Sequence, residues 1–395
     1  MLDALEVQLD GLWDLGRNLV LGWCLRDEGI DVLVLPHYEL GRVQRLRADM
    51  REDAAGFYRA ILSGSKRFSV RNFGRAEQAL ACHSAHIQLP DLKNLSGRKH
   101  LRAIETTVQR YGISYFQSRA VALFDIVGFS KLNAFERLAQ LNSLVYSCNA
   151  AQSKYGQRSS RFDFATSTTG DGFYVWNRDE GIHANTDLYS YVHLILADNA
   201  LARQRSRSRK DGAPLLKTAF HIDSYYEFFH SEGLRPSSST FIVGDVTIAL
   251  ARMIDRAIPG QILIGDFQRG DRDGADASDL NTLKFIDEVQ PQTSRLRGLK
   301  LAGEAVADIR CYLTGQRQED GNFSVRRFRL TDKHGYQRVI YNAKLNIHRR
   351  GASPIYLGLQ DSDLTKFEKQ ANVEELSLGP VDSAEPPGAF GAAAT

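Results

Sequence analysis

Short apolar runs alternate with amphipathic stretches from residue 115 to residue 314, and this alternation constrains the fold more than any other feature of the chain. Runs of β-type composition predict strands at 119–126, 162–168, 173–176, 216–222, 240–243, 261–265 and 308–313. Apolar residues at helical spacing predict helices at 130–155, 186–203 and 247–256. In the first of these helices the expected core face consists of Leu132, Phe135, Leu138, Leu141, Val145 and Cys148. The expected fold class is therefore α+β, with a sheet of about six or seven strands.

The segments on either side of this region have different patterns. Residues 1–110 are expected to be mostly helical, with helices at 48–62 and 100–111 and one short buried strand at 30–35. Short β-type runs at 323–330, 337–343 and 355–358 predict a small β-rich module over residues 315–361. Residues 374–395 are rich in proline, glycine and alanine, which predicts a disordered tail.

The composition excludes several classes of protein. Of the 395 residues 25% are charged, but the net charge is only +3, so the chain lacks the basic bias of proteins that bind nucleic acids or anionic membranes. The longest apolar runs, 32–36 and 121–124, are far shorter than the ~20 residues of a membrane-spanning helix. Acidic residues interrupt 1–25, which does not resemble a signal peptide, and the four cysteines form no C-x-x-C pair. We therefore expect a cytoplasmic protein with no nucleic-acid partner, no membrane insertion and no disulfide framework.

Two local clusters admit a functional and an ordinary interpretation. Cys82, His83 and His86 are close enough in sequence for a zinc site, but no fourth ligand is in view, and ordinary packing is favoured. The arginine-rich and serine-rich run 204–210 is short enough to be a solvated helix end, and this interpretation is favoured over nucleic-acid contact.

The first candidate for chemistry is Asp125, which ends an apolar strand before the chain turns at Gly128 towards a helix. A carboxylate in that position is costly to bury unless a partner compensates its charge, and a divalent cation does so. The backbone N–H groups of residues 127–130, including those of Gly128 and Phe129, would suit a triphosphate at a helix N-terminus. The ordinary alternative is that Asp125 caps the following helix.

The second candidate is Asp171, in the turn Thr169-Gly170-Asp171-Gly172 between two β-type runs. An Asp-Gly turn in this setting predicts a hairpin, and its tip can lie beside the end of the strand that carries Asp125. Two carboxylates placed there could hold two metal ions, one activating a ribose 3′-oxygen and the other stabilising the leaving pyrophosphate.

A third pair of motifs completes an ordered set. It consists of Gly244-Asp245-Val246-Thr247-Ile248-Ala249-Leu250-Ala251-Arg252-Met253 and of Ala257-Ile258-Pro259-Gly260-Gln261-Ile262-Leu263. Together with the motifs at Asp125 and Asp171, the chain resembles the class III nucleotidyl cyclases over residues 115–314. That family has F-x-D-I-x-G-F, a G-D hairpin, G-D-x-V-N-x-A-x-R-M and A-x-P-G-Q-I-L in this order. The resemblance implies a ferredoxin-like core that works as a head-to-tail homodimer.

The resemblance also implies roles for individual residues. Asp125 and Asp171 match the aspartates that bind two Mn²⁺ or Mg²⁺ ions, and the carbonyl oxygen of Ile126 is an expected further ligand. Arg252 matches the arginine that reaches the α-phosphate from the opposite protomer in the transition state. Arg297 precedes Gly298 where the family has a triphosphate-binding basic residue, and a solvated loop arginine is the ordinary alternative.

Three positions depart from the family pattern. Ile248 replaces the asparagine that lies four residues before the arginine, and it cannot hydrogen-bond the ribose unless Thr247 or another residue substitutes. Ser167 lies four residues before Asp171, where adenylyl cyclases have lysine and guanylyl cyclases have glutamate. Phe241 lies three residues before Gly244, where those enzymes have an acidic residue or, often, cysteine. A phenylalanine at this position would narrow a pocket for a two-ring base.

These departures, the helix segment 140–144 and the β-rich module make the chain most similar to the Pycsar pyrimidine cyclases of bacterial anti-phage defence. That resemblance implies conversion of UTP or CTP to the 3′,5′-cyclic monophosphate, which activates a separate effector protein. It also implies a sensing role for the C-terminal module. Two alternatives remain: an adenylyl or guanylyl cyclase with atypical base recognition, and a degenerate nucleotide-binding regulator. Ile248 favours the latter, whereas Asp125, Asp171 and Arg252 oppose it.

Overall fold

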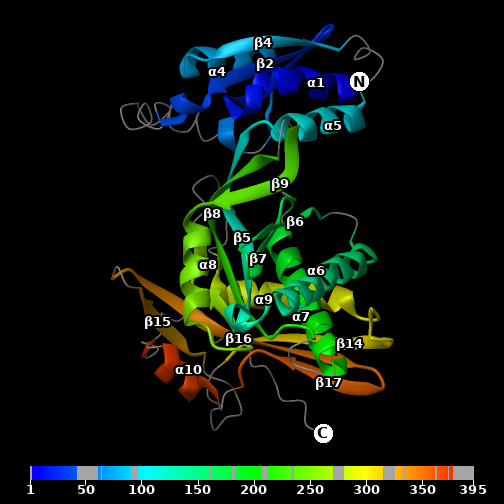
Figure 1. Cartoon of the computed structure of the whole chain (residues 1–395), viewed down its shortest axis with the longest axis vertical. Coiled ribbons are helices and arrows are strands. Elements are labelled where there is room, and N and C mark those ends of the chain that lie inside the picture. The colour runs from blue at the N-terminus through cyan, green and yellow to red at the C-terminus, as the bar shows by residue number, and fades with distance from the viewer. Residues whose placement is uncertain are drawn as a thin grey trace. The chain divides into compact units, whose positions relative to one another are not determined.

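The computed structural model describes residues 2–41, 61–63, 65–89, 97–159, 162–179, 181, 183–206, 212–232, 235–269, 280–314, 325–332, 335–360, 363–371 and 373–376. It divides the chain into two compact units (Figure 1). Unit one comprises Met1–Gln117 and Ser224–Gly244, and unit two comprises Ser118–Asp223 and Asp245–Thr395. The strands β5 (Ile113–Ile126) and β8 (Leu216–Glu232) contribute residues to both units.

Unit one contains a four-stranded sheet with the order β3-β1-β2-β4. Its strands are β1 (Asn18–Arg26), β2 (Gly29–Pro36), β3 (Arg67–Phe68) and β4 (His83–Gln88). Helices α1 (Leu2–Trp13) and α5 (Arg98–Gln109) pack on one face, and α4 (Val70–Leu80) packs on the other. Because helices cover both faces, alternate residues of β2 enter two separate apolar clusters.

The helix at 100–111 and the strand at 30–35 are confirmed, but the sequence analysis missed the rest of this sheet. The reason is visible in β4, which is an edge strand with mostly polar, exposed residues and therefore lacks an apolar signal. The helix expected at 48–62 lies almost wholly outside the described residues. Unit one also contains β9 (Arg235–Val243), which pairs with the end of β8.

Unit two is built on strands in the order β13-β14-β16-β10-β8-β5-β7-β6. The strands not yet introduced are β6 (Phe164–Thr168), β7 (Gly172–Asn177), β10 (Ile262–Gly265), β13 (Lys300–Leu301), β14 (Glu304–Leu313) and β16 (Gln337–Arg349). Helices α6 (Ala134–Gly156), α7 (Ala184–Arg205) and α9 (Thr282–Thr293) bury the main apolar core against one face. Helix α8 (Asp245–Arg256) lies on the opposite face, where Tyr174 and Lys217 donate hydrogen bonds to its backbone (Figure 1).

The C-terminal strands are part of this same sheet. β16 pairs with both β10 and β14, and β15 (Arg327–Thr331) and β17 (Ala352–Leu357) pair with β16. Residues 315–361 were expected to form a separate β-rich module, and the sheet was expected to have only about six or seven strands. Most of the middle of β16 is buried, and its apolar run carried no information about which strands it would join.

The expected tail is also partly ordered. Glu374–Leu376 forms the short strand β18 against β15, after helix α10 (Leu364–Ala371). The remainder of the tail lies outside the described residues. Among the helices of the described residues, none has the length and apolarity required to cross a membrane.

The face that α6 buries differs from the predicted one. Phe135 and Leu138 are 77% and 62% exposed, and of the predicted face only Cys148 is fully buried. The buried stripe is Gln140, Leu144, Ser147, Cys148, Ala151 and Tyr155. Because this stripe contains polar residues while the opposite side is apolar, hydrophobic periodicity alone selected the wrong face.

Candidate metal and nucleotide site

The two predicted aspartates lie together at one end of the β5–β7 pair. Asp125 is opposite Gly172 in the register, and the N–H group of Ile126 donates to the carbonyl oxygen of Asp171 over 2.9 Å. A Cβ atom on Gly172 would lie 1.8 Å from the carbonyl oxygen of Phe124, so only glycine permits this approach of the hairpin to β5. Gly170 has φ +95°, as the tight turn requires. The predicted hairpin and its position beside the first strand are thus confirmed.

Asp125 is placed in an environment that disfavours its charge. Its neighbours in the strand, Phe124 and Ile126, point into the main core, so Asp125 points to the face covered by α8. Burial, which is the largest cause, and the Asp171 carboxylate within hydrogen-bonding reach together raise the pKa of Asp125 to about 6. Asp255 on α8 acts in the same direction. Two carboxylates that share a partly buried space repel each other, which a bound cation would relieve.

Lys217 is the residue in this site that the sequence analysis missed. Its Nζ lies 3.9 Å from Oδ2 of Asp125, and its positive charge lowers the pKa of that aspartate. Both side chains are only 22% exposed. Lys217 follows Leu216, whose side chain enters the main core, so alternation along β8 directs the lysine to the Asp125 face. The sequence did contain a signal for Lys217, because it is a charged residue within the apolar strand expected at 216–222.

The residues fit a divalent cation held by a carboxylate pair. Within the described part of the chain, no group of three or more histidine, cysteine, aspartate or glutamate side chains forms a metal cluster. Mg²⁺ and similar ions, however, are commonly bound by one or two carboxylates together with substrate phosphates and water. Asp125 and Asp171 supply such a pair, and the role of the Ile126 carbonyl oxygen remains a prediction.

The loop after Asp125 differs from the expected phosphate-binding helix start. Gly128 has φ +73°, and a short 3-10 turn over Phe129–Lys131 follows it. The N–H group of Val127 already donates to the carbonyl oxygen of Leu215, so it is not available to a triphosphate. Arg137 donates to the carbonyl oxygen of Phe129 over 3.2 Å and holds the loop against α6.

Helix α6 begins at Ala134, after this loop. Its N-cap is Asn133, which forms a reciprocal capping box with Glu136. The alternative interpretation of Asp125 as the helix cap is therefore wrong.

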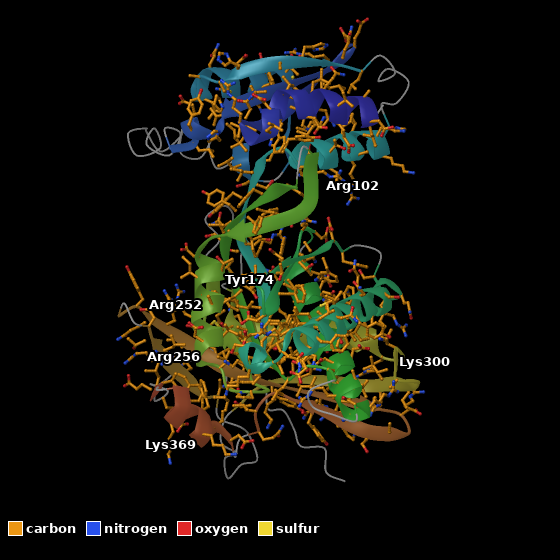
Figure 2. The ribbon with its side chains drawn as sticks, in the orientation of Figure 1. Arg102, Tyr174, Arg252, Arg256, Lys300 and Lys369 are labelled. Atoms are coloured by element: carbon orange, nitrogen blue, oxygen red, sulfur yellow. The ribbon has the colours of Figure 1, made fainter. Side chains whose placement is uncertain are left out.

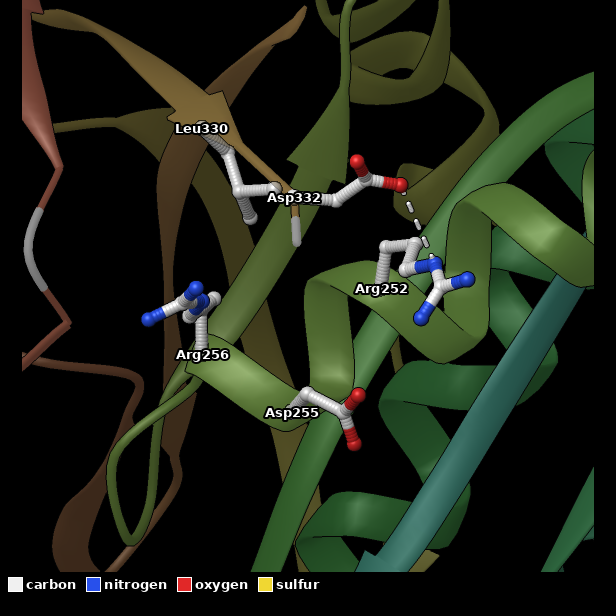
Figure 3. A pocket seen from close by; sticks show the side chains of 5 residues that line it. All are labelled: Arg252, Asp255, Arg256, Leu330 and Asp332. Carbon is white, nitrogen blue, oxygen red and sulfur yellow. Dashed lines mark ion pairs between the residues drawn. The ribbon is translucent and has the colours of Figure 1, made fainter. Parts of the chain in front are cut away.

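On α8 the two key positions of the motif point away from the core. Arg252 pairs through Nε with Oδ2 of Asp332 at 3.3 Å (Figure 3). Ile248, at the family asparagine position, is 52% exposed. The carbonyl oxygen of Thr247 accepts a hydrogen bond over 3.4 Å from the hydroxyl of Tyr174, a residue labelled in Figure 2. No hydrogen bond or ion pair in the described residues joins Arg252 to Asp125.

The residues proposed to read the base lie in different parts of the fold. Ser167 is opposite Tyr174 across the β6–β7 pair, and Tyr174 is opposite Leu123 of β5. Directly paired residues share a face, so Ser167 and Tyr174 are on the same face of the sheet as Asp125. Phe241 belongs to unit one, where its ring stacks on Phe228 with centroids 5.6 Å apart.

Arg297 is engaged by a neighbouring strand. Its Nη2 donates to Oδ1 of Asp308 over 3.0 Å, and the other oxygen of Asp308 accepts from Arg310. The Arg297 side chain is 59% exposed, which is the setting expected of a solvated loop arginine. A role in triphosphate binding remains a prediction.

The zinc hypothesis for the Cys82 cluster has little geometric support. His83 and His86 are three residues apart on β4 and therefore point to opposite faces of that strand. His86 contacts Oδ1 of Asp31 at 2.8 Å, and Cys82 is buried in an apolar cluster. These contacts are those of ordinary packing.

Neither a protein-family model nor a curated protein matches this chain. Solved structures that resemble it are nucleotidyl cyclase domains. The guanylate cyclase domain of RhGC from Catenaria anguillulae, in complex with GTP, has 14% identity and a TM-score of 0.35, covering 60% of this chain and 99% of its own. The adenylyl cyclase CyaB from P. aeruginosa has 17% identity and a TM-score of 0.36, covering 58% and 95%. A non-canonical dimeric guanylyl cyclase domain of the RhoGC fusion protein from Blastocladiella emersonii has 14% identity and a TM-score of 0.35, covering 60% and 98%.

Proposed function

We propose that this protein is a nucleotidyl cyclase that converts a nucleoside triphosphate into a 3′,5′-cyclic monophosphate and pyrophosphate. The observation that supports it most is the carboxylate pair of Asp125 and Asp171, partly buried at the end of β5 with a raised Asp125 pKa. Among the described residues Lys217 is the only cationic side chain that pairs with these two carboxylates, and such an acidic pair is a poor way to stabilise a fold and a good way to bind cations. The order of the surrounding motifs supports the same activity.

In this reaction the 3′-oxygen of the ribose attacks the α-phosphorus and loses its proton. The new O–P bond forms as the bond from the α-phosphorus to the bridging oxygen breaks, and pyrophosphate leaves. Two divalent cations, Mn²⁺ or Mg²⁺, would increase the acidity of the 3′-hydroxyl and neutralise the triphosphate. Asp125 and Asp171 would hold them. Arg252 would donate to the oxygens of the α-phosphate, where negative charge develops.

We further propose that the protein works as a homodimer in which Arg252 of one protomer completes the site of the other. The proposed substrate is UTP or CTP. Ser167 is too short to make the purine contacts of a lysine or glutamate, and Phe241 would restrict a two-ring base. The product would be a second messenger that activates an effector in anti-phage defence, a role that rests on the resemblance to the Pycsar cyclases.

One experiment tests both the cyclase activity and the choice of a pyrimidine substrate. Purified protein is incubated with each of the four ribonucleoside triphosphates and Mn²⁺ or Mg²⁺, and the products are identified by mass spectrometry. Cyclic UMP or cyclic CMP supports the pyrimidine assignment, and cyclic AMP or cyclic GMP as the main product supports a purine cyclase instead. Asp125→Ala and Asp171→Ala, checked for folding by circular dichroism, should abolish turnover. Near-full activity in either folded variant would contradict the two-aspartate site.

If none of the four triphosphates is cyclised, the protein is not a cyclase under these conditions, and the degenerate alternative has a specific observation in its favour. Ile248, exposed on α8, cannot provide the hydrogen bonds of the family asparagine. Nucleotide binding measured by calorimetry with wild-type protein and Asp171→Ala would then distinguish a regulator that binds nucleotide from a protein that does not.

A further inference from the structure

We propose that Asp332 is a positioning residue for Arg252: its carboxylate holds the guanidinium by Nε and aims the two terminal nitrogens at the α-phosphate. This inference rests on the proposed function. It assigns a role in catalysis to the turn between β15 and β16, a part of the chain outside the motifs of the core.

The contact is selective for one edge of the guanidinium. Oδ2 of Asp332 lies 3.3 Å from Nε of Arg252, and the terminal nitrogens point away from Asp332 (Figure 3). Within the described residues the Asp332 carboxylate is the only one that forms an ion pair with Arg252. A carboxylate that only masked the arginine would favour the bidentate geometry, which occupies two nitrogens. The observed contact leaves Nη1 and Nη2 to a substrate oxygen.

The carboxylate is itself fixed by the turn. The N–H group of Tyr336 donates to Oδ1 of Asp332 over 3.0 Å, and the N–H group of Gly335 donates to the Asp332 carbonyl oxygen over 3.0 Å. The Asp332 N–H group closes the turn by donating to the carbonyl oxygen of Tyr336 over 3.0 Å. One carboxylate oxygen is thus anchored to the turn backbone and the other to Arg252, so the turn sets the position of the guanidinium.

The surroundings strengthen this pair. The Asp332 side chain is 9% exposed and that of Arg252 is 28% exposed, so solvent screens the ion pair less than it would at the surface. Asp332, Arg252, Asp255, Arg256 and Leu330 line a cavity of about 180 Å³ (Figure 3). Asp255 is one helical turn from Arg252 but is exposed, and among the described residues no ion pair joins it to the guanidinium. The buried carboxylate is therefore the one that sets the arginine rotamer.

Prior orientation of the arginine would raise the rate rather than the affinity for substrate. A long, flexible side chain loses conformational freedom when it binds an oxyanion, and a partner that orders it beforehand removes that loss from the reaction step. The pair also links the arginine to the C-terminal elements, because β15 pairs with β18 and Arg326 beside it contacts Glu368 of α10 at 3.0 Å.

The test uses full-length Asp332→Asn. The amide can still accept the Tyr336 N–H bond in the turn, but it has no negative charge for Arg252. The expected result is a fall in kcat of about 10- to 100-fold with an unchanged KM and unchanged Mn²⁺ affinity. In the background of Arg252→Ala the same substitution should cause no further loss, because its effect acts through the arginine. The matched control is Glu368→Gln, which removes a C-terminal ion pair without touching Arg252 and should keep the wild-type kcat.

A second readout does not depend on activity. The Nε–H resonance of Arg252, assigned by its loss in Arg252→Lys, should shift and exchange faster with water in Asp332→Asn. An unchanged or increased kcat in an active enzyme would overturn the positioning role, and an increase would indicate that Asp332 inhibits the arginine. A further loss in the Arg252→Ala background would show that Asp332 acts through folding. If the wild-type protein cyclises none of the four triphosphates, the proposed function and the catalytic part of this inference fail together. The resonance would still report whether the ion pair exists.

Discussion

Asp125 lies directly opposite Gly172 across the β5–β7 pair, and this register brings the carboxylate of Asp171 within hydrogen-bonding reach of Asp125. The two acidic residues are 46 positions apart in sequence. They come together because the hairpin folds back with glycine on each side of Asp171. Negative charge is therefore concentrated at this position, with Lys217 as its counterion. Because the position is partly buried, ionisation of both carboxylates costs free energy.

The first prediction concerns stability and pH in the absence of metal. The folded protein holds the proton of Asp125 up to about pH 6, whereas an ordinary aspartate releases it near 3.8. Because the folded state binds more protons between these values, Asp125 reduces stability progressively as pH rises through this range, and the penalty is complete above pH 6. Asp125→Asn should therefore stabilise the protein at pH 8 in EDTA by about 1–2 kcal/mol, and have little effect below pH 4.

Urea unfolding at a series of pH values measures this effect. Asp163→Asn is the control. The Asp163 carboxyl is 63% exposed, and the residue directly precedes β6 rather than ending β5. A destabilised Asp125→Asn at pH 8 would contradict the charge-repulsion account. Addition of Mn²⁺ should make the wild-type protein more stable than Asp125→Asn, because the cation binds the wild-type aspartate pair more tightly than it binds the variant.

The second prediction concerns Lys217. Its ammonium group lies 3.9 Å from Asp125 and opposes a second positive charge in the site. Lys217→Met should therefore tighten Mn²⁺ binding at pH 8 by about three- to tenfold in the absence of nucleotide. Isothermal titration calorimetry provides the measurement. Lys284→Met removes an equal charge from the exposed side of α9, on the other face of the sheet, and should leave the affinity unchanged. Weaker binding by Lys217→Met would instead indicate that the lysine maintains the geometry of the pair.

The third prediction concerns assembly. If Arg252 acts across a dimer, Asp125→Ala should be inactive as a homodimer, and Arg252→Ala should keep only a small residual turnover. After subunit exchange at equal concentrations, half of the dimers are mixed, and each mixed dimer contains one intact and one doubly damaged site. Activity should therefore return to about a quarter of the wild-type value. Absence of recovery, with exchange demonstrated by differently tagged chains, would show that each site is built within one chain.

The fourth prediction concerns the base. We expect wild-type protein to prefer UTP, with CTP slightly below it and both purine triphosphates far lower. Phe241→Ala should open space for the second ring of a purine. The ratio of kcat/KM for UTP to kcat/KM for a purine triphosphate should therefore fall by about 10- to 200-fold. The control is Phe135→Ala, which truncates a phenylalanine that is 77% exposed on α6. If ATP or GTP exceeds both pyrimidines by about tenfold or more in wild-type protein, the pyrimidine assignment is wrong.

Several elements were predictable because their signals are local. The hairpin at Asp171 follows from an Asp-Gly turn between two β-type runs, and α8 follows from its apolar periodicity. The strand ending at Asp125 is recognisable from the unbroken apolar run Ala120–Phe124 that directly precedes the carboxylate. Each of these features needs only neighbours within one or two turns of chain, so the sequence expresses them directly.

Other features depend on partners far along the chain. The core face of α6 was predicted wrongly because the helix presents Phe135 and Leu138 outward and buries Gln140 and Ser147. The expected separate module proved continuous with the main sheet, because β16 inserts between β10 and β14. Local hydrophobicity is the same whichever strand a buried segment joins, and only long-range pairing decides the partner.

By itself the sequence determined which residues carry the candidate chemistry: a carboxylate at the end of an apolar strand, another at a hairpin tip, and an arginine on an amphipathic helix. Each of these positions is a property of a short segment. Only the tertiary structure decided what each residue faces. It brought Lys217 beside Asp125 from β8, and it brought Asp332 to Arg252 from a turn 80 residues later in the chain. Charges act through space and not along the chain, so the counterions of a site are chosen by the fold that surrounds it.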